Sequence, residues 1–105
     1  MMRSEGLGPL QQGQSVAIIG GGPAGASCAI ALLNLAQKMG REIEVVIYEG
    51  KTFTGETHHN QCVGVLSPPL EDVLKEGLGV GFPHHLIQRR VTKYVLHSDR
   101  QAIIL

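Results

Sequence analysis

A cluster of glycines between two apolar stretches constrains this chain more than any other feature. Residues 20–25 are Gly-Gly-Gly-Pro-Ala-Gly. They follow a short apolar run, 16–19, and begin a stretch, 23–39, whose residues favour a helix that Gly40 would terminate. A second apolar run, 43–48, is rich in β-branched residues. This order predicts a strand, a glycine turn, a helix and a parallel strand, which is a βαβ unit with a right-handed crossover.

The glycine cluster also matches the GxGxxG pattern of dinucleotide-binding turns. In that pattern Gly20 permits the tight turn, Gly22 lets a pyrophosphate approach the backbone, and Gly25 lets the helix pack closely on the strand. Pro23 and Ala24 begin the helix, whose N-terminal N–H groups favour an anion. Glycines that merely end a strand are the alternative, but a strand before the cluster and a helix after it favour binding.

Glu49 supplies the second half of the same pattern. It lies at the end of the second predicted strand, 24 positions after Gly25, near the usual spacing of about 20. Its carboxylate is suited to accept the hydroxyl protons of an adenosine ribose and would repel a 2′-phosphate, which disfavours NADP at this site. The alternative is an exposed acid at a strand end. Glu49 suits NAD as well as FAD.

Charge and cysteine content exclude several classes of function. The nine basic and nine acidic residues cancel, and only 4% of residues are aromatic, so we expect no nucleic-acid partner. Two cysteines and no apolar signal segment predict a reducing, cytoplasmic setting.

Residues 6–37 contain no charged residue, as a membrane-spanning segment would. The glycines and the proline of residues 20–25 interrupt this stretch, however, so we expect no transmembrane segment. His58, His59 and Cys62 lack metal-ligand spacing, so we expect no metal site.

The rest of the chain carries weaker signals. We expect a flexible leader over 1–14, a buried helix with Cys28 packed on its apolar stripe, and a strand over 16–19 that is buried on both faces. After Glu49 we expect a polar loop over 51–61, a short helix from 67 to 76 stopped by Gly77 and Gly79, and two strands over 90–97 and 102–105.

From residue 16 to Glu49 the chain resembles the FAD-binding start of the flavoproteins with two dinucleotide-binding domains. This group includes flavin monooxygenases and geranylgeranyl-reductase-like enzymes. Besides the three glycines of the pattern, the match includes Ala29, Gly40 and Glu49. The sequence GGGPAG is more typical of the flavin branch than of simple nicotinamide dehydrogenases. The resemblance implies FAD as the cofactor, with NAD(P)H as an electron donor.

A second resemblance covers residues 62–67, Cys-Val-Gly-Val-Leu-Ser. This stretch is similar to the C-x-G-x-x-S segment of geranylgeranyl-reductase-like proteins. The resemblance implies that Cys62 faces the flavin ring as a catalytic residue and that the backbone at Gly64 approaches the cofactor. The residues alone leave another interpretation open, because an isolated cysteine is most often a small buried apolar side chain.

Together these features predict an α/β fold: a Rossmann-like βαβ unit followed by a loop, a short helix and a β-hairpin. We expect residues 15–105 to form a partial FAD/NAD(P)-binding domain, because the chain is too short for a complete one with a substrate domain. The implied function is the FAD-binding segment of an oxidoreductase that passes hydride or electrons from a nicotinamide to an apolar or aromatic substrate. The alternatives are a free-standing, non-catalytic nucleotide-binding module, which is regulatory or requires a partner chain, and a fragment of an NAD-only dehydrogenase.

Overall fold

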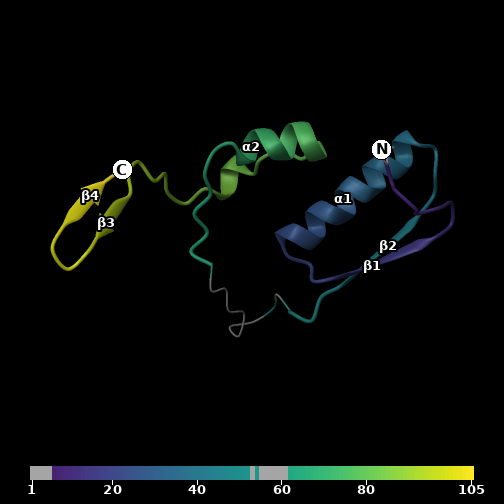
Figure 1. The fold of residues 1–105 in the computed structure, drawn as a ribbon, viewed down its shortest axis with the longest axis horizontal. Helices are drawn as coiled ribbons and strands as arrows, with labels where there is room; N and C mark the ends of the chain where they lie inside the picture. Colours follow the sequence, from purple (N-terminus) through teal and green to yellow (C-terminus); the bar gives the residue numbers. More distant parts are fainter. Residues whose placement is uncertain (1–5, 53, 55–61) are drawn as a thin grey trace.

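A βαβ unit forms the first half of the molecule. The computed structural model describes residues 6–52, 54 and 62–105. Strand β1 (Ser15–Ile19) leads through a glycine loop into helix α1 (Pro23–Lys38), and strand β2 (Glu44–Tyr48) follows. The two strands pair in parallel, from Ser15 opposite Glu44 to Ile19 opposite Tyr48, and α1 lies along them (Figure 1). Mixed helices and strands with a parallel pair confirm the α/β class.

Helix α1 has the predicted bounds to within one residue but is less buried than predicted. It begins at Pro23 and is followed by Met39 as its C-cap and by Gly40 at a φ of +65°. Only Ala29 and Ala36 are buried. Cys28 is exposed, so the prediction that it packs in the core is wrong. A sheet of two strands covers only a narrow strip of a helix, and the other side chains of α1 remain outside that strip.

Within residues 6–52, 54 and 62–105, helix α1 covers one face of the β1–β2 sheet and no element covers the other. Ile18 points toward α1, because its Cγ2 lies 3.2 Å from the position of a Cβ built on Gly25. Since neighbouring residues of a strand point to opposite faces, Ile19 points away from the helix, and it is 83% exposed. The prediction of a strand buried on both faces is therefore wrong. We call the uncovered surface the open sheet face; it comprises Ala17, Ile19, Val46 and Tyr48.

Residues 6–14 pack against the turn between α1 and β2. Leu7 is buried. The N–H of Gly13 donates to the carbonyl of Glu42 (2.7 Å), and the guanidinium of Arg41 donates to the carbonyl of Leu10 (2.9 Å). The described part of the expected leader therefore lies against the βαβ unit.

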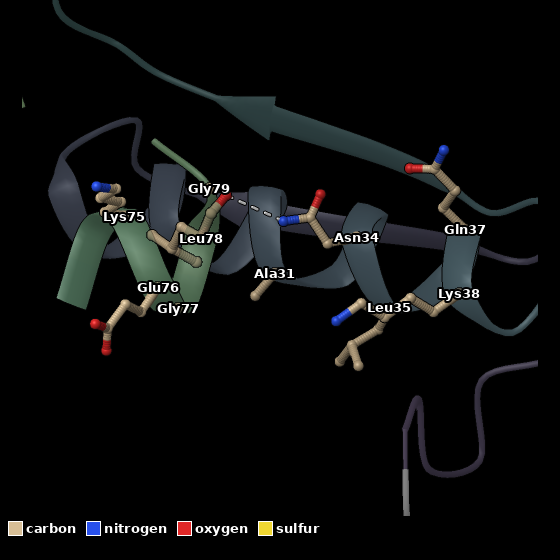
Figure 2. Close-up of a pocket in the computed structure, with 10 residues that line it drawn as sticks. All are labelled: Ala31, Asn34, Leu35, Gln37, Lys38, Lys75, Glu76, Gly77, Leu78 and Gly79. Carbon is tan, nitrogen blue, oxygen red and sulfur yellow. Dashed lines mark hydrogen bonds between the residues drawn. The ribbon is translucent and has the colours of Figure 1, made fainter. Parts of the chain in front are cut away.

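A second helical segment packs on α1. It starts as α2 (Leu70–Asp72), continues as the π-helix η1 (Val73–Leu78), and ends at Gly79, whose φ of +68° is a conformation that glycine adopts at low cost. The prediction that Gly77 stops this helix is wrong, and the stop at Gly79 is confirmed. The side-chain amide of Asn34 on α1 donates to the carbonyl of Leu78 (3.2 Å; Figure 2), which joins the two helices.

The last elements extend away from the βαβ unit. A short 3-10 helix, η2 (His84–Leu86), precedes the antiparallel hairpin of β3 (Val95–His97) and β4 (Ala102–Ile104). The first of these strands starts five residues later than predicted. Neither hairpin strand packs on another described helix or strand (Figure 1). The radius of gyration is 19.0 Å, against about 13 Å for a compact domain of this length.

None of the helices in the described part of the chain combines the length and apolar character needed to cross a bilayer.

Candidate dinucleotide-binding site

The glycine loop between β1 and α1 begins with a turn at Gly20. Its φ of +104° lies in a region that L side chains rarely adopt, so a residue with a Cβ would be strained here. The N–H of Gly20 donates to the carbonyl of Tyr48 (2.8 Å). This hydrogen bond attaches the loop to the C-terminal end of β2 and so fixes where the chain turns toward the helix.

Gly25 lies where the first turn of α1 meets the end of β1. A Cβ built on Gly25 would overlap the carbonyl oxygen of Gly20 and would lie 3.2 Å from Cγ2 of Ile18. Because the first of these neighbours is backbone, it has no rotamer with which to move away. The helix thus approaches the strand at a distance that only glycine allows.

The N-terminus of α1 faces open space. Gly22 is its N-cap, no side chain caps it, and its first turn contains no acidic residue. A Cβ built on Gly22 would meet no heavy atom within 4 Å. The helix geometry leaves the N–H groups of Ala24 and Gly25 without acceptors inside the helix, and the positive end of the helix dipole lies there. Residues 22–25 therefore have the geometry of an anion cradle.

Glu49 lies beside the same loop. The position of a Cβ on Gly21 is 3.3 Å from Cβ and 3.4 Å from Cγ of Glu49. The carboxylate side chain is exposed, so it is open to a ligand. Sequence reasoning did not single out Gly21, which occupies a variable position of the GxGxxG pattern. A Cβ at Gly21 would make a tight contact with the side chain of Glu49, so the two residues pack closely at this point of the loop.

Cys62 and Gly64 lie in a different part of the molecule. The N–H of Gly64 donates to Sγ of Cys62 (3.4 Å), Gly64 has a φ of +74°, and both residues are exposed. The segment 62–69 leads into α2, apart from the loop between β1 and α1 (Figure 1). The structure thus brings Glu49 to the glycine loop and places the second predicted segment elsewhere.

Two hollows elsewhere in the described chain do not include the glycine loop. The first, of about 440 Å³, lies between α1 and η1, where Figure 2 shows Asn34, Lys38 and Lys75 around it. The second, of about 470 Å³, lies at the C-terminal end of α1. Among the described residues no group of three histidines, cysteines or acids could hold a metal ion. His58 and His59 lie outside those residues.

Comparison of the chain with models of known families, with curated proteins and with solved structures finds no significant match. The interpretation of the site therefore depends on the geometry of this chain's own residues.

Proposed function

We propose that this chain binds FAD through its adenosine diphosphate half and serves as the FAD-binding segment of an FAD-dependent oxidoreductase. The observation that carries the proposal is the approach of Glu49 to Gly21 at the N-terminal end of α1. The Cβ and Cγ of Glu49 lie beside the residue that precedes the anion cradle. Adenosine diphosphate needs donors for its pyrophosphate and an acceptor for its ribose hydroxyls, and the cradle and Glu49 can supply this pair of groups.

The residues of the site have different roles in the proposed binding of FAD. The open space at Gly22 admits the pyrophosphate to the backbone N–H groups of the first helical turn. Glu49 accepts hydrogen bonds from the ribose hydroxyls. Gly20 and Gly25 contribute indirectly, because they permit the turn and the close packing that aim the helix N-terminus at this space. When bound, FAD supplies hydride or electron transfer between a nicotinamide donor and an apolar or aromatic substrate.

Competition between nucleotides tests the proposal directly. FAD bound to the 105-residue chain should be displaced by ADP and by NAD⁺, because all three share the adenosine diphosphate group. NADP⁺ should compete at least about tenfold less well than NAD⁺, since Glu49 repels the 2′-phosphate. Equilibrium dialysis with fluorescence detection of free FAD would measure this order. If FAD does not bind saturably, or if ADP fails to displace it, the proposal is wrong.

Substitution of Glu49 by alanine should weaken FAD binding by about 1–3 kcal/mol, the range for hydrogen bonds to a charged group. The fold should persist, because the side chain is exposed. Calorimetric titration would measure the change. Glu42→Ala is the matched control, since Glu42 is another exposed acid close to β2 but lies before the strand, away from the loop. Equal losses in the two variants would contradict the assignment of Glu49 to the ribose, because Glu42 lies away from the loop.

The 105-residue chain alone should oxidise NAD(P)H no faster than free FAD does. Flavin catalysis requires a reactive ring that is held against its substrate and shielded from water. The proposed site accounts only for the adenosine end of the cofactor, and Cys62 belongs to the segment that leads into α2. Spectrophotometry of NAD(P)H oxidation with added FAD would measure the rate. Turnover that depends on the chain, from a monodisperse sample, would contradict the expectation and assign a complete active site to it.

A further inference from the structure

The stretch between η2 and the hairpin, residues 88–93, is exposed and makes no hydrogen bond to any described residue. It belongs to no helix, strand or turn. Its neighbours on both sides are hydrogen-bonded. The N–H of Ile87 donates to the carbonyl of His84 (3.2 Å), and Tyr94 exchanges backbone hydrogen bonds of 3.2 and 2.8 Å with Leu105. We call residues 88–93 the connecting segment; a second protein can reach its backbone without unfolding any element.

Two adjacent arginines lie in the connecting segment. Arg89 and Arg90 precede Thr92 by three and two positions. Both are exposed, and neither guanidinium pairs with a carboxylate of the described residues. Guanidinium groups stay charged and bind carboxylates through two parallel hydrogen bonds. In an extended chain Arg89 lies about 10 Å before Thr92, since each residue advances the chain by about 3.3 Å. An acidic groove could therefore bind the pair and hold the hydroxyl at a set distance.

The hydroxyl of Thr92 is available for such a partner. The side chain is exposed and has no hydrogen bond to a described residue. Other hydroxyls are engaged within the protein: Ser98 accepts from the N–H of Gln101 (3.1 Å), and Ser27 donates to the carbonyl of Pro23 (2.6 Å). Among the described serines and threonines, only Thr92 has an arginine within the three preceding positions.

We propose that Thr92 is phosphorylated by a serine/threonine kinase whose acidic substrate groove binds Arg89 and Arg90. Kinases select their substrates partly by such charge patterns. In the transfer, the bond between the γ-phosphorus of ATP and its bridging oxygen breaks, and a bond from this phosphorus to Oγ1 of Thr92 forms. The hydroxyl proton passes to the catalytic carboxylate of the kinase, and ADP leaves.

The phosphate would change the charge of the C-terminal part of the chain. Residues 77–105 hold four basic side chains (Arg89, Arg90, Lys93 and Arg100) and one acidic side chain, Asp99, for a net charge of +3. A phosphothreonine carries nearly two negative charges at neutral pH, so the net charge of this part would fall to about +1.

Incubation of the 105-residue chain with magnesium, ATP and the catalytic subunit of a cyclic-AMP-dependent kinase tests the assignment, because this enzyme selects arginines before the hydroxyl. Mass spectrometry should show one phosphate per chain, on Thr92. Thr92→Ser should still accept the phosphate. Thr92→Ala should not, with an unchanged circular dichroism spectrum, because the side chain is exposed. No phosphorylation, phosphorylation of Ser98, or phosphorylation of Thr92→Ala would overturn the proposal.

Substitution of the arginines tests how the site is recognised. Arg89→Ala and Arg90→Ala should each lower kcat/KM for phosphorylation by about tenfold or more, the effect of losing a hydrogen bond between charged groups. Arg100→Ala is the matched control, since Arg100 is an exposed arginine that follows the hydroxyl and lies at the hairpin turn. Equal rates in all three variants would mean that the kinase does not bind the arginine pair, and the proposal would be wrong.

A synthetic peptide of residues 86–95 tests whether the folded chain presents the site. Because the connecting segment is already exposed, the peptide and the intact chain should be phosphorylated at similar rates. A peptide faster by about tenfold or more would mean that the chain must open locally first, which would contradict the proposal. The connecting segment includes no residue of the glycine loop and does not include Glu49. This result is therefore independent of the FAD titration.

Discussion

Replacing Gly25 with alanine should destabilise the βαβ unit by at least about 2 kcal/mol, within the range for overpacking a tight contact. The direction of the change in the free energy of unfolding distinguishes Gly25 from an ordinary helical glycine. Alanine inside a helix is ordinarily about 1 kcal/mol more favourable than glycine. At Gly25 the new Cβ would overlap the carbonyl oxygen of Gly20, so the strand and the helix would have to separate. Urea unfolding followed by circular dichroism would measure the free energy of unfolding.

Gly77→Ala is the matched control for that substitution. Gly77 also lies in a helix, but a Cβ built there would meet no heavy atom within 4 Å, and its φ is not positive. The control should be neutral or slightly stabilising. If Gly25→Ala were as stable as this control, the helix and the strand would not be held at the distance described, and Gly25 would have no packing role.

A valine at Gly22 should abolish FAD binding and leave the fold intact. None of the described residues lies within 4 Å of the new Cβ, so the substitution costs only the weaker N-capping of valine, about 1 kcal/mol. The branched side chain would occupy the space assigned to the pyrophosphate. We expect FAD affinity to fall by at least about 100-fold, which corresponds to about 2.7 kcal/mol. Equilibrium dialysis would measure the affinity, and circular dichroism the fold.

Gly81→Val provides the comparison for this second substitution. Gly81 is exposed, has open space around its Cα, and lies after η1, away from the glycine loop. FAD should bind this variant as it binds the parent chain. If Gly22→Val binds FAD as tightly as the parent chain does, the phosphates bind elsewhere and the glycine loop has only a structural role.

Local signals predicted the βαβ unit well, and burial poorly. The apolar run before Gly20, the glycine after α1 and the β-branched run before Glu49 each act within a few residues, so they can be recognised without a tertiary structure. Burial depends on what covers an element. Ile19 and Cys28 are apolar residues in the elements predicted for them, yet both are exposed, because the sheet has two strands and one helix.

In the candidate site, too, features within one continuous stretch of chain were predictable from the sequence, and contacts between distant stretches were not. The GxGxxG spacing located the loop and the start of α1, since both lie in one continuous stretch of chain. The approach of Glu49 to Gly21 depends on the register of β1 with β2, which spacing alone does not specify. Helix η1 continued through Gly77 because a single glycine lowers helix stability by only about 1 kcal/mol.

The contacts of residues 6–14 have a consequence for how the strands come apart. Strand ends are usually the first to fray, since local opening there has the lowest free energy. In this unit the hydrogen bond from the N–H of Gly13 to the carbonyl of Glu42 lies at the N-terminal ends of both strands. The hydrogen bond from the N–H of Gly20 to the carbonyl of Tyr48 lies at their C-terminal ends. Neither end of the pair can open without breaking a bond outside the strands themselves. Amide protons along β1 and β2 should therefore exchange as one cooperative block, which would keep the glycine loop aligned with Glu49 between rare openings of the whole unit.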